Sequence, residues 1–250
     1  MVTRAGFTLS LDCEGLWGMA DQPTVVQAGL ICDASLAQAY GLISRLLDVN
    51  GIKATCAFVS AFAAGEDALR AHVSLLRELA SYSPAWFAHA IPAIEHKRTP
   101  GWFGEAFYLK LRAAGHEMAW HGATHLCLDD DTSAGAVELE LQLAARLFEV
   151  LDHSPRTIVF PRNLVGHLDR LQHAGFQTYR ARPPAGLTGR LLGLLSELNV
   201  LDRRVHAKPI KQHGWHVSPA GFFLNWPSGA RSLVPIAVTV SRWKSLLRAQ

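Results

Sequence analysis

Two carboxylates, Asp12 and Glu14, stand two residues apart where the first strand-like segment of the chain ends. Residues at this spacing in an extended strand project to the same side, so both side chains can face one site while Cys13 turns away. Two carboxylates that close repel each other unless a cation or a shared proton compensates for their charge. The pair therefore predicts a cation site, with two solvated turn residues as the alternative that this feature alone leaves open.

A second group of ligand-type residues is the histidine pair in His121-Gly122-Ala123-Thr124-His125. Histidines at i and i+4 lie on one face of a helical turn and can chelate one ion. The pair is not the zincin motif, because Gly122 occupies the position of that motif's glutamate. In a chain with 12 histidines the spacing alone is weak evidence, and ordinary core or surface histidines are the alternative. Its place directly after a strand favours a metal site completed by the acidic strand end.

The predicted metal ligands are Glu14, His121 and His125, with Asp12 beside them. Two histidines and one carboxylate leave coordination positions open for water and substrate, which is typical of a catalytic rather than a structural site. A second carboxylate can act as general base toward a metal-bound water. The residues thus predict metal-assisted hydrolysis with Asp12 as the base. Zinc is the expected ion, and cobalt or nickel would also fit this donor set.

A further strand end supplies an arginine in Phe160-Pro161-Arg162-Asn163. Arg162 could pair with Asp12, fix its orientation and favour its ionised form. The alternative is an ordinary surface arginine or a side chain at a helix N-terminus.

A recurring unit positions these strand ends: an amphipathic helix, a glycine and a short apolar strand. The glycines Gly51, Gly115 and Gly175 are expected in the left-handed conformation that ends a helix. Alternating helices and strands predict parallel βαβ units in one α/β domain over residues 1–250, with chemistry at the strand carboxyl ends. The expected helices are 37–50, 67–80, 104–114, 136–151, 164–174 and 187–201, and the expected strands are 7–12, 53–59, 116–120, 157–160 and 176–180.

The proline- and aromatic-rich segment 83–102 departs from this pattern. It is expected either to wall the site or to cross the surface irregularly. Six tryptophans could stack on sugar faces or belong to the core, and the sequence assigns none of them as substrate-binding: Trp17, Trp86, Trp102, Trp120, Trp215 and Trp226.

Composition excludes several classes of protein. The chain has 250 residues, of which 49% are hydrophobic and 18% charged, as in ordinary globular proteins. Its net charge of +3 is dispersed, so no nucleic-acid-binding face is expected. Four scattered cysteines without a CxxC pair indicate reduced thiols. Neither a leader-like start nor an apolar run long enough for a membrane span is seen, which predicts a cytoplasmic protein.

Together these residues resemble the polysaccharide deacetylase family, the NodB-homology carbohydrate esterases, over roughly residues 7–182. The segment from Asp12 to Glu14 is similar to the D-x-E variant of the family's first motif, and the two histidines match the second. The segment around Arg162 is similar to the third motif, and 176–180 to the strand that follows. The resemblance implies Asp12 as catalytic base, Glu14, His121 and His125 as metal ligands, and Arg162 as the partner of the base.

The resemblance also implies a fold and a reaction. The fold is a distorted (β/α)₇ barrel of the NodB-homology type. The reaction is metal-dependent removal of an N-acyl group, usually acetyl, from an amino sugar. Members with the D-x-E signature often act in bacterial surface-polysaccharide pathways such as O-antigen and lipopolysaccharide assembly. The sequence specifies neither the sugar nor the oligomeric state.

The C-terminal part departs from the family pattern, which usually places a general-acid histidine after a late apolar strand. Here residues 241–250 read as a helix and the chain stops. Either the final barrel strand and its histidine are lacking, or His206, His213 or His216 substitutes. Two alternatives to a working deacetylase follow: a weak or inactive metal- and sugar-binding domain of the same fold, and an amidohydrolase acting on a small non-sugar amide.

Overall fold

The structure is a computed structural model, and it describes residues 8–23, 29–182, 209–219 and 234–248. Its centre is a seven-stranded sheet in the order β1-β2-β3-β4-β5-β7-β6. All neighbouring pairs are parallel except β6 and β7, which are antiparallel. The predicted α/β class is therefore confirmed. The strands are β1 (Ser10–Cys13), β2 (Thr55–Phe58), β3 (Glu117–Trp120), β4 (Thr157–Ile158), β5 (Thr178–Arg180), β6 (Ile210–Gln212) and β7 (Trp215–Ser218).

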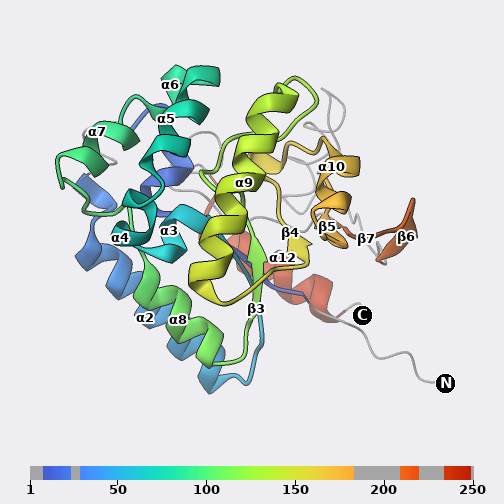
Figure 1. Cartoon of the computed structure of the whole chain (residues 1–250). Helices are drawn as coiled ribbons and strands as arrows, with labels where there is room; N and C mark the ends of the chain where they lie inside the picture. Colours follow the sequence, from blue (N-terminus) through green and yellow to red (C-terminus); the bar gives the residue numbers. More distant parts are fainter. Residues whose placement is uncertain (1–7, 24–28, 183–208, 220–233, 249–250) are drawn as a thin grey trace.

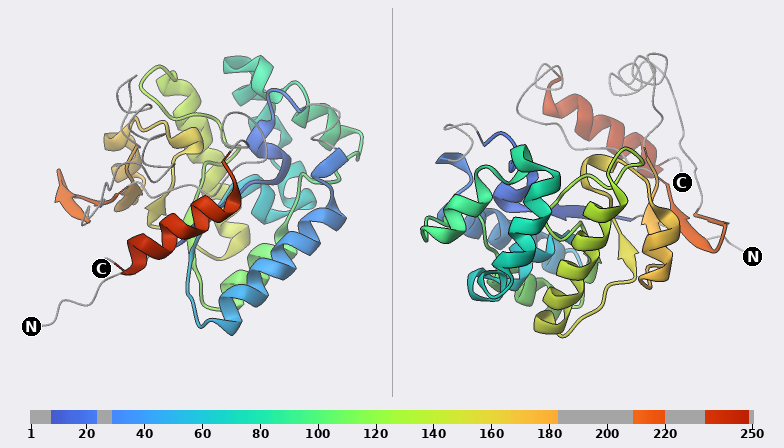
Figure 2. Two further views of the ribbon diagram at one scale, coloured as in Figure 1. Left: turned by 180° about the vertical axis from the view of Figure 1, so that it is seen from behind. Right: turned by 45° about the horizontal axis from the view of Figure 1, so that its top comes forward.

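Helices cover the sheet on both sides. In Figure 1, α9 lies in front of β3 and β4, and α2 and α8 lie side by side next to it. Seen from behind, α12 crosses the opposite side of the sheet (Figure 2). The α-helices are α2 (Asp33–Val49), α3 (Ser60–Ala64), α4 (Glu66–Arg70), α5 (Val73–Tyr82), α6 (Pro84–Phe87), α7 (Ala90–Glu95), α8 (Glu105–Ala113), α9 (Ala134–Leu151), α10 (Leu168–His173) and α12 (Ile236–Arg248), and the 3₁₀ helices are η1 (Gly15–Met19) and η2 (Pro161–Asn163).

Most predicted elements are present, although the short helices α3, η1 and η2 were not predicted and three further differences are seen. The helix expected over 67–80 is two helices, α4 and α5, separated where His72 has a non-helical φ of −117°. The segment 83–102 contains the short helices α6 and α7. The hairpin of β6 and β7 was not predicted, because its strands are short and partly polar. Its two-residue turn, His213 and Gly214, has positive φ at both positions, as tight hairpins require. The helix expected over 187–201 lies outside the described residues.

The helix–glycine–strand units form as predicted. Gly51, Gly115 and Gly175 follow the C-caps of α2, α8 and α10, and their φ angles are +61°, +75° and +100°. These angles are easily reached only without a Cβ atom, so each glycine ends its helix and directs the chain into the next strand.

Helix α9 contributes one whole face to the core. It begins at Ser133, whose hydroxyl accepts a hydrogen bond from the Ala136 N–H at 3.3 Å. Its inner face packs against α3 and α5. That face is apolar except for Glu140, whose side chain is fully buried. The buried residues of α9 are Ala136, Val137, Leu139, Glu140, Leu143, Ala144, Leu147 and Leu151.

Strand register brings the candidate ligands to one edge of the sheet. Cys13 pairs with Phe58 and Phe58 with Trp120, so the carboxyl ends of β1, β2 and β3 are level. Glu14 and His121 each follow one of these strand ends directly. Strand β2 lies between β1 and β3, and adjacent strands are about 4.8 Å apart. The side chains of Glu14 and His121 can therefore meet above the end of β2.

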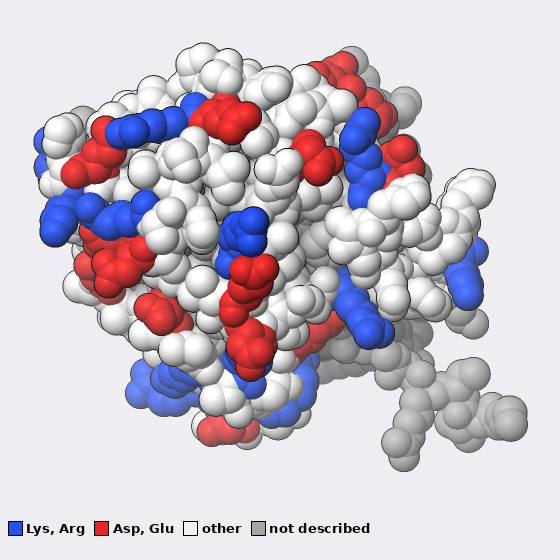
Figure 3. Space-filling view, in the orientation of Figure 1, with Lys and Arg blue, Asp and Glu red and all other residues white. Residues whose placement is uncertain are grey.

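The remaining sequence expectations that the structure addresses concern cysteines, surface charge and membrane spans. All four cysteines are free. On the face shown in Figure 3, basic and acidic residues alternate over the surface instead of gathering by sign. No helix within the described ranges has both the length and the apolar character needed to cross a bilayer.

Candidate metal centre

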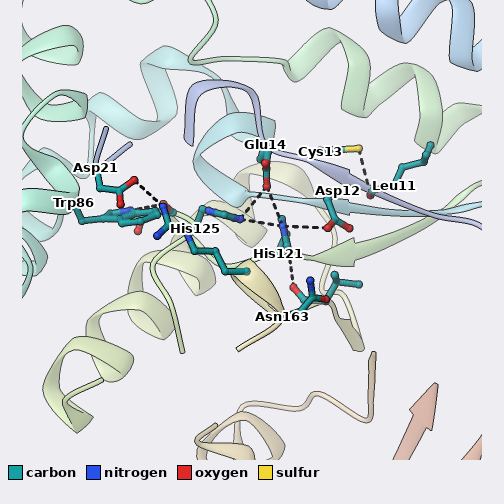
Figure 4. A network of polar contacts seen from close by, with 12 residues as sticks. Leu11, Asp12, Cys13, Glu14, Asp21, Trp86, His121, His125 and Asn163 are labelled. Atoms are coloured by element: carbon teal, nitrogen blue, oxygen red, sulfur yellow. Dashed lines mark hydrogen bonds and ion pairs between the residues drawn. The ribbon is translucent and has the colours of Figure 1, made fainter. Parts of the chain in front are cut away.

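Glu14, His121 and His125 converge on one point (Figure 4). The Oε2 atom of Glu14 lies 3.1 Å from His121 Nε2 and 2.9 Å from His125 Nε2. The two Nε2 atoms are 3.1 Å apart. Within the described part of the chain, these three residues form the one group of His, Cys, Asp and Glu ligand atoms close enough to hold an ion. The predicted ligand set is therefore brought together, in a form that could bind a metal ion.

The histidines converge through a loop and not through a helical turn. Gly122 has a φ of +84° and His125 a φ of +62°, both in the left-handed region. A Cβ atom on Gly122 would lie 3.1 Å from Pro161 Cγ and 3.2 Å from the His125 nitrogen. The predicted i, i+4 geometry of a helix is thus wrong, although the two histidines do come together in a group that could hold a metal ion. A left-handed non-glycine residue such as His125 costs conformational energy and is often found at functional sites.

The ring of His121 is fixed in one tautomer by the backbone. Its Nδ1 atom lies 2.6 Å from the Val159 carbonyl oxygen, which can only accept a hydrogen bond. Nδ1 therefore carries a proton, and in the neutral ring Nε2 presents its lone pair toward Glu14. Such a hydrogen bond to the far nitrogen orients metal-binding histidines in proteins. His121 is 1% exposed, so water does not compete for this nitrogen.

His125 is held by packing rather than by a hydrogen bond at its far nitrogen. Its ring lies 5.9 Å from the Trp86 ring, tilted by 30°. Trp86 in α6 donates its indole N–H to the Thr124 carbonyl at 3.0 Å. The Nδ1 atom of His125 is buried and has no hydrogen-bond partner among the described residues. Trp86 thus walls the site, which is one of the two expectations for segment 83–102.

The charges within the triad stabilise one another. Burial raises the pKa of Glu14, but its hydrogen bonds to His121 and His125 outweigh burial and hold that pKa well below its usual range. Burial lowers the pKa of His121, but Glu14 and Asp12 together raise it above the ordinary value. Burial dominates at His125, whose pKa is lowered. The lowered pKa of Glu14 favours its ionised form and the lowered pKa of His125 favours its neutral form, which are the forms in which these side chains bind metals.

Asp12 lies next to the triad, as predicted, but its partner is Arg180 at the end of β5. The two guanidinium nitrogens Nη1 and Nη2 donate to Oδ1 and Oδ2 of Asp12, each at 2.9 Å. Arg180 also donates to Ser10 and Asn163, at 2.9 Å each. Burial raises the pKa of Asp12, but His121 and Arg180 outweigh burial and lower it. Asp12 Oδ2 is 3.9 Å from His121 Nε2.

Arg162 does not pair with Asp12, so that expectation is corrected. Its Nη2 atom donates to Asp21 Oδ1 at 2.7 Å, and its guanidinium lies 4.7 Å from the centre of the Trp86 ring. Both Arg162 and Asn163 have positive φ, +52° and +55°, which turns the arginine away from Asp12. Arg180 was not predicted as the partner, although it too is an arginine at a strand end, because two arginines at strand ends cannot be told apart by their position in the sequence.

Gly18 in η1 is another residue that sequence analysis did not single out. A Cβ atom there would overlap the carboxylate of Glu14. The absence of a side chain at Gly18 therefore leaves the space that the carboxylate of Glu14, a candidate metal ligand, occupies.

We predict that Gly18→Ala weakens zinc binding by at least about 10-fold, the size of effect typical of residues that orient metal ligands. The fold should persist, because the clash falls on the end of a side chain that can swing away. Isothermal titration with zinc measures the affinity, and thermal melting the stability. Gly41→Ala is the matched control, since a Cβ atom there meets nothing within 4 Å. Equal zinc affinity in Gly18→Ala and wild type would show that the carboxylate position is not critical.

The structure places two of the three histidines named as substitutes for the general acid. His213 is exposed in the turn before β7, at the amino end of a parallel strand and thus at the edge opposite the triad. His216 is exposed within β7 and pairs with Thr178, two residues before the strand ends. His206 lies outside the described residues, as does Trp226. The other five tryptophans named above are buried, with 0–6% exposure.

Comparison of the chain with protein-family models, curated proteins and solved structures finds no match. The resemblance to the polysaccharide deacetylases therefore depends on the motif residues alone, and the activity that it implies is a proposal.

Proposed function

We propose that the protein is a metal-dependent hydrolase that removes an N-acyl group, usually acetyl, from an amino sugar. The observation that carries the proposal is the convergence of Glu14, His121 and His125 within 3.1 Å, with Asp12 3.9 Å from His121. Hydrolysis by a metal-activated water requires metal ligands and, next to them, a carboxylate that is free to accept a proton. The triad would supply the ligands and Asp12 the free carboxylate. Zinc is the proposed ion, with cobalt and nickel as substitutes.

The sheet supports the finer proposal of a distorted (β/α)₇ barrel. Strands β1 to β5 follow one another in chain order and are all parallel, and the candidate ligands lie at their carboxyl ends. Active sites of α/β barrels lie at this edge. A cytoplasmic location and a role in O-antigen or lipopolysaccharide synthesis belong to the same proposal.

The proposed mechanism assigns each residue a task. A bound divalent ion would supply Lewis acidity toward the acyl carbonyl and acidify a water molecule. Asp12, ionised and held in place by both guanidinium nitrogens of Arg180, accepts the proton of the attacking water. Asp12 then returns this proton to the leaving nitrogen, so one carboxyl group serves as base and acid. Arg180 keeps the carboxyl group in one orientation through both transfers.

One observation favours a second candidate function, a metal- and sugar-binding domain with little turnover. The pKa of Asp12 is below its ordinary value, because His121 and Arg180 outweigh the effect of burial. A carboxylate with a lowered pKa is a weaker general base. The two candidates differ in turnover and not in metal binding.

The test is acyl release by protein reconstituted with zinc. A panel of N-acetylated amino sugars is incubated with wild type, and free acetate and free amine are measured together. We expect equal amounts of both from at least one sugar, and none from His125→Ala. Zinc-loaded wild type that releases no acetate from any sugar would contradict the hydrolase proposal and favour the binding domain.

A further inference from the structure

Glu140 on α9 is a buried carboxylate that the proposed mechanism does not use. Its side chain is completely excluded from solvent. Oε2 accepts hydrogen bonds from the backbone N–H groups of Ala123 at 2.7 Å and Thr124 at 3.3 Å. Oε1 accepts a short hydrogen bond from the Thr124 hydroxyl. All three hydrogen bonds of the carboxylate within the described part of the chain are thus with the two residues that precede His125 in the loop of the candidate metal site.

The other polar groups of this loop are held by different elements. The carbonyls of Gly122 and Ala123 accept from the N–H groups of Ser60 and Ala61 at 3.0 and 2.9 Å. The Thr124 carbonyl accepts from Trp86. Helices α3, α6 and α9 therefore fix the loop from three directions, and α9 acts through a single side chain.

Burying the carboxylate of Glu140 to accept hydrogen bonds from two N–H groups costs folding free energy. No lysine, arginine or histidine within the described ranges forms an ion pair with Glu140. Burial raises its pKa to about 7, against the opposing effect of its hydrogen bonds to Thr124 and Ala123. Burying a charge without a cation costs free energy unless hydrogen bonds compensate. The cost is understandable if the loop must adopt one conformation, because that conformation places His125, a non-glycine residue, in the unfavourable left-handed region.

We propose that Glu140 is a positioning residue that holds the loop of Ala123 and Thr124 so that the Nε2 atoms of His121 and His125 meet at Glu14. This inference rests on the metal site of the proposed function, but not on the reaction. A positioning residue affects zinc affinity when it is replaced, whereas a residue that only fills the core affects stability alone. Glu140 touches neither substrate nor ion, and it acts through the backbone of the loop.

Two substitutions separate the hydrogen bonds from the charge. Gln is nearly isosteric, and its amide oxygen can accept from both N–H groups while its NH₂ group donates to the Thr124 hydroxyl. Glu140→Gln therefore keeps the three contacts but turns them into neutral hydrogen bonds, which are roughly half as strong as those to a charged acceptor, so the loop is held less firmly. Glu140→Leu loses both the contacts and the charge. Glu138→Gln is the matched control, because Glu138 lies exposed on the same helix.

The experiment uses the full chain and zinc alone. Competition with a chromophoric chelator measures zinc affinity, and amide hydrogen exchange at Ala123 and Thr124 in the metal-free protein measures how firmly the loop is held. We expect zinc affinity to fall about 10-fold in Glu140→Gln and about 100-fold in Glu140→Leu, the range typical of groups that orient metal ligands. The two amides should exchange faster in Glu140→Leu, and Glu138→Gln should match wild type in both measurements.

Wild-type zinc affinity in Glu140→Gln and Glu140→Leu alike would overturn the inference. So would unchanged exchange at both amides in Glu140→Leu. If Glu140→Leu fails to fold, Glu140→Gln with reduced zinc affinity and an unchanged melting temperature supports positioning, whereas equal zinc affinity contradicts it. Wild type that binds zinc but releases no acetate defeats the proposed hydrolase and leaves this inference standing.

Discussion

Wild-type protein reconstituted with zinc is expected to hold one ion per chain, and His121→Ala and His125→Ala are each expected to lose it. Both imidazoles are buried, at 1% and 2% exposure, and both direct Nε2 at Glu14 Oε2 within 3.1 Å. Removing either imidazole leaves two protein ligands. Catalytic zinc sites usually have three protein ligands and an open coordination position, so two are too few for tight zinc binding. Elemental analysis after dialysis against zinc-free buffer gives the stoichiometry directly.

The control for this prediction is His173→Ala, because His173 is exposed on α10, where its Nδ1 atom lies 2.7 Å from the Asp169 carbonyl oxygen of the same helix. It should retain one zinc per chain. Melting temperatures of the metal-free proteins show whether a lost ion reflects a lost ligand or a lost fold. Wild type that takes up no zinc, cobalt or nickel would exclude the hydrolase and leave a domain whose triad serves another purpose.

Asp12→Asn is expected to retain zinc and to lose activity by about 10²- to 10⁴-fold, the contribution typical of general acid–base catalysis. Asparagine keeps the size of the side chain but cannot accept the proton of the attacking water. The ligand atoms of the triad are untouched, so zinc content should equal that of wild type. Steady-state acetate release together with elemental analysis separates the two effects. An Asp12→Asn protein that hydrolyses at the wild-type rate would refute the assignment of the base.

The partner of the base is tested with a matched pair of arginine variants. Arg180→Gln removes the bidentate pair with Asp12 and should lower activity while leaving zinc bound. Arg162→Gln removes an ion pair with Asp21 instead, so its effect on the proton-transfer step should be small. A larger loss of activity in Arg162→Gln than in Arg180→Gln would contradict the assignment of Arg180 as the partner of Asp12 and favour Arg162, the partner expected from the sequence.

The sequence by itself determined the class of fold and which three residues, Glu14, His121 and His125, come together in a group that could hold a metal ion. Apolar alternation, helix periodicity and the glycines after α2, α8 and α10 are local signals, and local signals depend on a few neighbouring residues. The ligands could be predicted because each follows a strand, and parallel strands bring their carboxyl ends to one edge. Asp12, Glu14, His121 and His125 were found in this way. Whether these residues perform hydrolysis stays a prediction.

Tertiary structure alone decided which side chain pairs with which. Arg162 and Arg180 both follow strands, and the sequence gives no means of choosing between them as partner of Asp12. The choice depends on two left-handed residues, Arg162 and Asn163, that turn the first arginine toward Asp21.

Gly18 and Glu140 were likewise invisible in the sequence. In the sequence, a glycine in a short 3₁₀ helix and a glutamate in an amphipathic helix carry no sign of a special role. Their role becomes apparent only from the residues that pack against them. Gly18 leaves the space for the Glu14 carboxylate, and Glu140 accepts the two N–H groups of the histidine loop. Such contacts join residues that neither periodicity nor motif spacing relates, because they depend on how helices and loops pack in three dimensions.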